Sequence, residues 1–149
     1  MAGNEVCPNS STGWIERGGT RETTTGWRII VSTPRRQVWV YFDGHLLESY
    51  LAVVGKPSTP TPTGDFFVEE TETMPSTAAG GPYVLALSAR SNVLQDFDGG
   101  PGQIGIHGRD NLGGTLGQAE SHGCMRLATA DITWMAARIG PGVPVTILG

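Results

Sequence analysis

The chain has 149 residues and a mass of 15.7 kDa, which suits one domain with its own core and is too short for two. Ten Lys and Arg residues against fourteen Asp and Glu residues give a formal net charge of −4, so we expect no nucleic-acid partner. No run of about 18 apolar residues occurs, so we expect no membrane span. The first residues lack a basic start and an apolar core, and they do not form an intact signal peptide.

The apolar pattern divides the chain into a predicted tail or linker, residues 1–25, and a single predicted domain, residues 26–149. Segments rich in β-branched and aromatic residues predict strands, and these are Trp27–Ser32, Gln37–Phe42, His45–Val54, Asp65–Glu70, Tyr83–Ala89, Gln103–His107 and Val143–Leu148. The dipeptide Asp43-Gly44 predicts a tight hairpin between the second and third of these strands. The chain is therefore predicted to be mainly β, beginning as a meander, and we expect a monomer.

Three other segments are predicted outside the strands. Gly55–Gly64 carries too many prolines to join a sheet and is predicted to be an extended connector. Thr71–Pro82 is small and polar, and we expect it to be a flap that covers the substrate. One helix is predicted near the C-terminus, capped by Thr129 and ended by Gly140-Pro141. Its apolar residues recur at helical spacing, and they are Ile132, Met135, Ala136 and Ile139.

The most informative stretch is Ser121–Arg126 (SHGCMR), which contains a candidate nucleophile. A free thiol has a pKa near 8.5, and an adjacent imidazole or guanidinium lowers that pKa and raises the reactive thiolate fraction. Cys124 has His122 two residues before it and Arg126 two residues after it. His107 ends a predicted strand, and the glycine-rich loop that follows can bring it back beside the thiol.

Backbone groups around the thiol suit acyl transfer. Gly123 removes side-chain bulk where an electrophile must approach. The successive N–H groups of His122, Gly123 and Cys124 are predicted to form an anion-binding nest, and hence an oxyanion hole. The residue types and their order therefore indicate a cysteine acyl-transfer site.

Two plainer interpretations remain open for these residues. A lone cysteine is usually a buried, inert apolar residue, although three polar neighbours in SHGCMR argue against that here. Zinc is the second alternative, because His107, His122 and Cys124 are all permissible ligands. The spacing lacks a CxxC or HExxH pattern, however, so we expect no metal and no other cofactor. His45 is interpreted as a structural histidine, and Cys7 is expected to be free.

Three motifs together resemble the catalytic domain of the L,D-transpeptidases, the cysteine enzymes that cross-link bacterial peptidoglycan. Ile104–Gly108 (IGIHG) matches the strand-borne histidine of that family, and Ser121–Arg126 (SHGCMR) matches its nucleophile motif. Gly55–Gly64 (GKPSTPTPTG) matches its proline-rich segment. The resemblance spans about Thr25 to Gly149 and implies a β-sandwich-like fold of mixed strands with one packed α-helix near the C-terminus.

The resemblance also implies a role for each matched residue. Cys124 is then the nucleophile and His107 its base, with the backbone carbonyl of Gly108 orienting the imidazole. The resemblance further implies that three residues shape the pocket, the oxyanion hole or the substrate contacts, and these are Ser121, His122 and Gly123. Arg126 is implied to hold the motif or a substrate carboxylate.

The implied substrate is the peptidoglycan stem tetrapeptide, so the implied location is the cell envelope. The thiol attacks the carbonyl of the third residue, releases the terminal D-alanine, and passes the acyl group to an amine to form a 3→3 cross-link. Water as the acceptor makes the same site an L,D-carboxypeptidase. A non-catalytic wall-binding β-domain is the remaining alternative. Carbapenem-type β-lactams are the implied covalent inhibitors.

Overall fold

The computed structural model describes Asn9, residues 13–96 and residues 100–149 of the chain. Its strands are β1 (Trp27–Ser32), β2 (Gln37–Phe42), β3 (His45–Leu51), β4 (Val54–Gly55), β5 (Gly64–Thr73), β6 (Tyr83–Arg90), β7 (Gln103–Gly108), β8 (Ala119–Ser121), β9 (Met125–Leu127) and β10 (Pro144–Leu148). The helix of the described residues is α1 (Thr129–Ala136), which is too short to cross a membrane. The predicted fold class, mainly β with one helix near the C-terminus, is confirmed.

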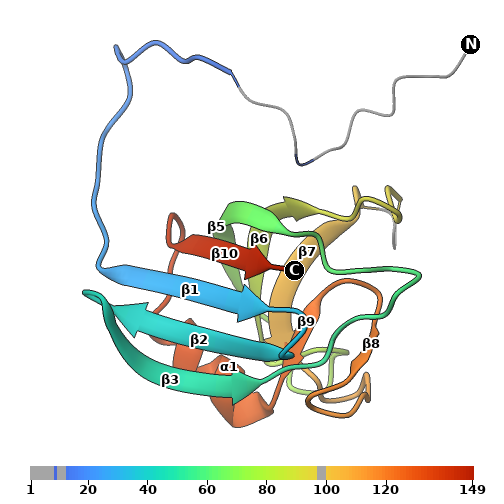
Figure 1. Cartoon of the computed structure of the whole chain (residues 1–149). Coiled ribbons are helices and arrows are strands. Elements are labelled where there is room, and N and C mark those ends of the chain that lie inside the picture. The colour runs from blue at the N-terminus through green and yellow to red at the C-terminus, as the bar shows by residue number, and fades with distance from the viewer. Residues whose placement is uncertain (1–8, 10–12, 97–99) are drawn as a thin grey trace, which may run out of the picture.

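The described strands form one mixed sheet in the order β3-β2-β1-β10-β5-β6-β7-β9, beside a small β4-β8 sheet (Figure 1). Strand β10 returns to pair in parallel with β1, and β9 pairs in parallel with β7, while the other neighbours in the large sheet are antiparallel. Figure 1 shows the sheet curling over, so that β1 to β3 lie on one side of the core and β5 to β7 on the other. The result is a β-sandwich-like fold.

Alternation along the strands fills the core. In β1 and β2 the fully buried residues Ile29 and Val31 pair with Val40 and Val38 in register, so their side chains point to the same face. Helix α1 packs across β6 and β7 and buries Ile132 and Met135 completely. Because α1 lies directly after β9, this packing fixes the position of β9, the strand that follows Cys124.

The structure corrects two local predictions and adds two short strands that were not predicted. Ala128, which has no side-chain cap, stands at the N-terminus of α1, and the hydroxyl of Thr129 donates to Asp110 instead. The predicted strand His45–Val54 is interrupted. The chain stops pairing with β2 at the end of β3, and Val53 instead exchanges two backbone hydrogen bonds of 2.9 Å with Arg126. The short strands β8 and β9 flank the cysteine motif and carry no alternation long enough to predict them. Cys7 lies outside the described residues.

A matched pair of leucines tests the assignment of the core. Leu87 in β6 is fully buried, whereas Leu47 in β3 is 47% exposed. We expect Leu87→Ala to lower the free energy of unfolding by about 3 kcal/mol, because it removes buried methyl groups and leaves a cavity. Leu47→Ala should change it by less than about 1 kcal/mol. Urea unfolding at neutral pH measures both, and similar losses for the two variants would contradict the assignment.

Candidate active site

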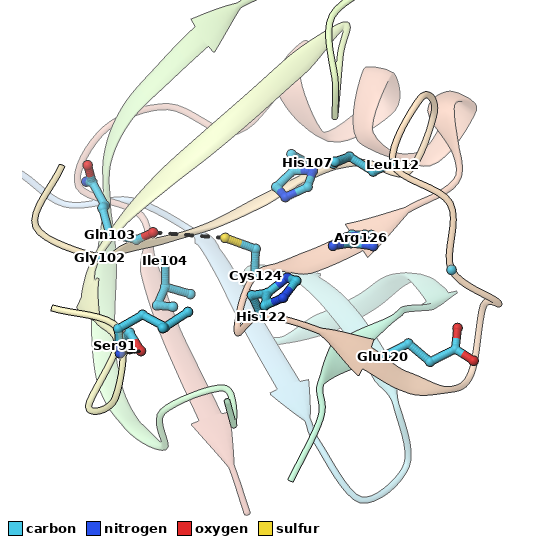
Figure 2. Close-up of a pocket in the computed structure, with 12 residues that line it drawn as sticks. Ser91, Gly102, Gln103, Ile104, His107, Leu112, Glu120, His122, Cys124 and Arg126 are labelled. Atoms are coloured by element: carbon cyan, nitrogen blue, oxygen red, sulfur yellow. Dashed lines mark hydrogen bonds between the residues drawn. The ribbon is translucent and has the colours of Figure 1, made fainter. Parts of the chain in front are cut away.

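A cavity of about 520 Å³ lies at the edge of the sheet formed by β7 and β9 (Figure 2). The residues that line it are Ser91, Leu94, Gly102, Gln103, Ile104, His107, Leu112, Gly114, Glu120, His122, Cys124 and Arg126. Four of the residues singled out in the sequence therefore face one space: His107, His122, Cys124 and Arg126. The other three, Gly108, Ser121 and Gly123, do not line it.

Parallel pairing of β7 and β9 brings the Cys124 thiol beside β7, the strand that carries His107. Ile106 is opposite Met125, and His107 is opposite Arg126, so Cys124 lies alongside Gly105. The Gly105 N–H donates to the Cys124 sulfur at 3.4 Å, and the sulfur lies 3.9 Å from the carbonyl oxygen of Gln103. The Cys124 side chain is partly exposed into the cavity. It is therefore accessible from outside, as a nucleophile must be.

The tautomer of His107 follows from one hydrogen bond. Its Nδ1 lies 2.7 Å from the carbonyl oxygen of Gly108, and a carbonyl oxygen can only accept, so Nδ1 carries the proton. In the neutral ring the other nitrogen, Nε2, is then the unprotonated one. Burial lowers the pKa of His107, and the nearby Arg126 guanidinium lowers it further, against the opposing effect of the Gly108 bond. The ring is consequently a neutral proton acceptor near pH 7.

Burial has the opposite effect on the thiol. It raises the pKa of Cys124, and this outweighs the lowering by the Gly105 hydrogen bond and by Arg126. The sequence predicted that neighbouring His122 and Arg126 would lower the thiol pKa overall, and that expectation is wrong. The resting site therefore holds a neutral thiol, which must lose its proton when an electrophile arrives.

A glycine packs against the imidazole from the other side. A Cβ on Gly80 would lie 2.7 Å from His107 Nδ1, and the φ of Gly80 is +82°, which favours glycine. The Gly80 carbonyl accepts from the Gly108 N–H at 2.9 Å, while the Gly80 N–H donates to Asp110 at 3.0 Å. Gly80 thus packs behind the His107 ring, a role that the sequence did not reveal.

Ser121 holds the cysteine loop together from within. Its hydroxyl donates to the carbonyl of Cys124 at 2.6 Å and accepts from the N–H of Gly123 at 3.1 Å. The Gly123 N–H is therefore engaged, and the expected nest of three donors keeps at most the N–H groups of His122 and Cys124. Gly123 has a φ of +127° and lies against Ile104, so it lets the loop turn where a side chain would collide.

Arg126 is anchored by its backbone and leaves much of its guanidinium unpaired. Its backbone pairs with Val53, and one terminal nitrogen donates to Gly113 at 3.3 Å. Its Nε is buried, and no described residue accepts a hydrogen bond from it. Because the Nε is buried, a ligand in the cavity can reach only the rest of the guanidinium, whose positive charge suits an anionic group at this edge.

The expected flap segment is placed beside the site. No residue of Thr71–Pro82 lines the cavity, and Thr71–Thr73 belong to β5, so the segment is partly strand. Asn111 instead donates to the carbonyls of Ser76 and Ala78, which ties the segment to the loop after β7. Within the described part of the chain, no group of three His, Cys, Asp or Glu residues that could hold a metal ion is found.

Two functional contacts were missed because they come from the proline-rich connector. The hydroxyl of Thr61 donates to Gly123 at 2.7 Å, and that of Thr59 donates to Ser121 at 3.2 Å. Both threonines are buried. The sequence placed this segment outside the sheet correctly, but nothing in its composition indicated which partner it would contact.

Known proteins are similar to this chain in sequence and in fold. A family model described as the L,D-transpeptidase catalytic domain (YkuD) matches residues 26–147. YkuD of Bacillus subtilis, a candidate L,D-transpeptidase, is 31% identical over 127 residues, which cover 83% of this chain and 67% of that protein. L,D-transpeptidase 1 of Mycobacterium tuberculosis is 28% identical over 145 residues, covering 88% and 56% of the two chains.

The fold is also similar to that of the LD transpeptidase LdtMt1, solved in complex with imipenem. The TM-score is 0.62 at 22% identity, and the match covers 83% of this chain and 59% of that one. The chain belongs to the L,D-transpeptidase catalytic domain family, as its motifs suggested. It spans about two thirds of the length of YkuD, 56% of L,D-transpeptidase 1 and 59% of the chain solved with imipenem.

Substituting the glycine behind the imidazole should displace the ring. Gly80→Ala adds a methyl group 2.7 Å from His107 Nδ1, so the Gly108 hydrogen bond should be lost. Long-range ¹H–¹⁵N NMR of the imidazole reports the tautomer, and the Nδ1–H form should dominate in the unaltered protein but not in Gly80→Ala. Gly44→Ala is the matched control, because Gly44 has a φ of +81° and open space around it. An unchanged His107 spectrum in Gly80→Ala would contradict the contact.

The protonation of His107 should also appear in the pH dependence of stability. Burial lowers its pKa in the folded chain, so an NMR titration should give a value below the ordinary value of about 6.5. As the pH falls through about 6.5, the unfolded chain binds this proton before the folded one does, and stability decreases. His107→Gln should lack this part of the decrease in urea unfolding between about pH 7.5 and 5.5. A titration midpoint above 6.5 would overturn the assignment.

Proposed function

We propose that this chain is a cysteine acyl-transferase that acts on peptidoglycan stem tetrapeptides and that residues 26–149 form its catalytic unit. The observation that carries the proposal is the placement of a partly exposed thiol and a neutral, oriented imidazole on paired strands in one cavity. Membership of the L,D-transpeptidase family supports the reaction class and the substrate. The reaction then takes place in the cell envelope, where peptidoglycan lies.

The first half-reaction forms a thioester on Cys124. Its sulfur attacks the carbonyl carbon of the third stem residue while Nε2 of His107 accepts the thiol proton. The peptide C–N bond then breaks, and the imidazolium returns the proton to the departing nitrogen of the terminal D-alanine. Because both groups are neutral at rest, the charges of thiolate and imidazolium develop only during attack.

The surrounding residues supply binding and charge. Arg126 lines the cavity, and the positive charge of its guanidinium suits the carboxylate of the D-alanine that leaves. His122 lines the cavity beside the thiol and shapes the pocket. Ser121 and Gly123 hold the loop shape, and Gly108 fixes the imidazole tautomer.

The second half-reaction transfers the acyl group to an amine of a second stem and produces a 3→3 cross-link. The amine nitrogen attacks the thioester carbonyl, His107 removes a proton from that nitrogen, and the sulfur leaves as the thiol. Water as the acceptor would give a free carboxylate instead of a cross-link. The nature of the product therefore separates a transpeptidase from a carboxypeptidase.

Imipenem provides a covalent probe of this assignment. We propose that Cys124 opens the β-lactam ring, so that the intact protein gains the mass of one imipenem molecule. The ring C–N bond breaks, and the nitrogen takes the proton from His107. Cys124→Ala should abolish the adduct, and an adduct that persists in this variant would reject the nucleophile.

The base can be tested with two histidines of the same chain. His107→Ala should slow acylation by about 10²–10⁴-fold, the usual range for loss of a general base. His45 is exposed at the start of β3, and His45→Ala should leave the rate within about twofold, as surface substitutions do. Mass spectrometry of timed samples gives both rates, and equal losses would show that the wrong base has been chosen.

A further inference from the structure

Two threonines of the connector between β4 and β5 donate hydrogen bonds to backbone carbonyls of the cysteine loop. Thr59 is 8% exposed and Thr61 is 5% exposed, and neither lines the cavity. The Thr61 hydroxyl donates to the carbonyl oxygen of Gly123 at 2.7 Å. The carbonyl oxygen of Ser121 accepts from the Thr59 hydroxyl at 3.2 Å and from the Lys56 N–H at 3.0 Å. These hydrogen bonds hold the carbonyls of Ser121 and Gly123 on the side of the loop away from the cavity.

The hydroxyl of Thr61 has a single orientation. It accepts a hydrogen bond of 2.9 Å from the N–H of Gly55, so its own proton is left for Gly123. The approach of the two chain segments is very close, since a Cβ on Gly55 would lie 2.4 Å from the nitrogen of Thr61. Thr61 is therefore a fixed donor.

The planar peptide bond transmits this contact to the reacting centre. In a trans peptide the C=O and the N–H point in opposite directions, so holding the Gly123 carbonyl toward Thr61 turns the Cys124 N–H the other way. That direction faces the cavity, which Cys124 lines and Thr61 does not. No described residue accepts a hydrogen bond from the Cys124 N–H, whereas the Gly123 N–H is bound to Ser121.

We propose that Thr61 is a positioning residue that aims the Cys124 N–H at the oxygen of the tetrahedral intermediate. This inference rests on the proposed function. The carbonyl oxygen of the substrate becomes negatively charged when the sulfur adds to its carbon. A backbone donor already fixed in place stabilises that charge without having to reorient. Thr61 touches no substrate atom and acts only through the Gly123–Cys124 peptide.

Two substitutions at Thr61 distinguish the effect of its hydroxyl on the Cys124 N–H from a general effect on folding. Thr61→Val keeps the shape and removes the hydroxyl, and Thr61→Ser keeps the hydroxyl. With imipenem as the probe, Thr61→Val should lower the first-order acylation rate by about 10–100-fold, somewhat less than outright loss of an oxyanion donor. The half-saturating imipenem concentration should change little, and Thr61→Ser should restore most of the rate.

Thr71→Val is the matched control. The Thr71 hydroxyl also donates to a backbone carbonyl, that of Ile139, at 3.2 Å, but far from the cysteine loop in sequence and outside the cavity lining. This variant should acylate at the wild-type rate. If Thr61→Val acylates as fast as Thr71→Val, the proposed role of Thr61 is wrong.

NMR of the unaltered protein tests the same geometry without any substitution, should Thr61→Val fail to fold. On acylation by imipenem, the amide proton of Cys124 should move downfield, because it gains the thioester oxygen as an acceptor. The amide proton of Gly123 should stay in place, since it remains bonded to Ser121. A downfield shift at Gly123 with none at Cys124 overturns the proposal.

The proposed function and the proposed role of Thr61 can be contradicted by different results. An imipenem adduct on a residue other than Cys124 defeats the proposed function. Normal acylation of Cys124 together with an indifferent Thr61→Val, or with an unmoved Cys124 amide, defeats the role of Thr61 alone.

Discussion

The site depends on the parallel pairing of β7 with β9. That pairing sets His107 opposite Arg126 and leaves Cys124, just before β9, alongside Gly105. A slip of one residue would turn every side chain of β9 to the other face and remove the thiol from the cavity. Helix α1 prevents such a slip, because it follows β9 at once and buries Ile132 and Met135 in the core.

Burial then determines how the two reacting groups share one proton. It raises the pKa of the Cys124 thiol and lowers that of His107, so both are neutral before the substrate binds. A neutral thiol is a weak nucleophile and is thereby protected from adventitious oxidation. Arg126 favours the thiolate and disfavours the imidazolium, so its charge helps only one half of the ion pair. In the proposed reaction, attack by the Cys124 thiol is therefore concerted with proton transfer to His107.

The sequence predicted the features that neighbouring residues determine, but not those that depend on contacts between distant parts of the chain. Trp27–Ser32 and Gln37–Phe42 were predicted with correct bounds, because alternation and a tight turn at Asp43-Gly44 are local properties. The cap at Thr129 was wrong, because that hydroxyl found a distant partner, Asp110.

The same division holds for the site. The motif Ser121–Arg126 predicted a cysteine acyl-transfer site, but the direction of the Cys124 pKa shift depends on burial, which a motif does not report. The contacts of Thr61 with Gly123 and of Gly80 with His107 join segments far apart in the chain, and no local pattern carries them.

The most direct test of the account is product analysis by mass spectrometry, with a stem tetrapeptide as donor and an added amine as acceptor. The account predicts release of one D-alanine for each acyl group transferred, a tripeptide joined to the amine, and a transient thioester on Cys124. A free tripeptide that forms at the same rate whatever the amine concentration, or turnover that survives replacement of Cys124, would contradict it.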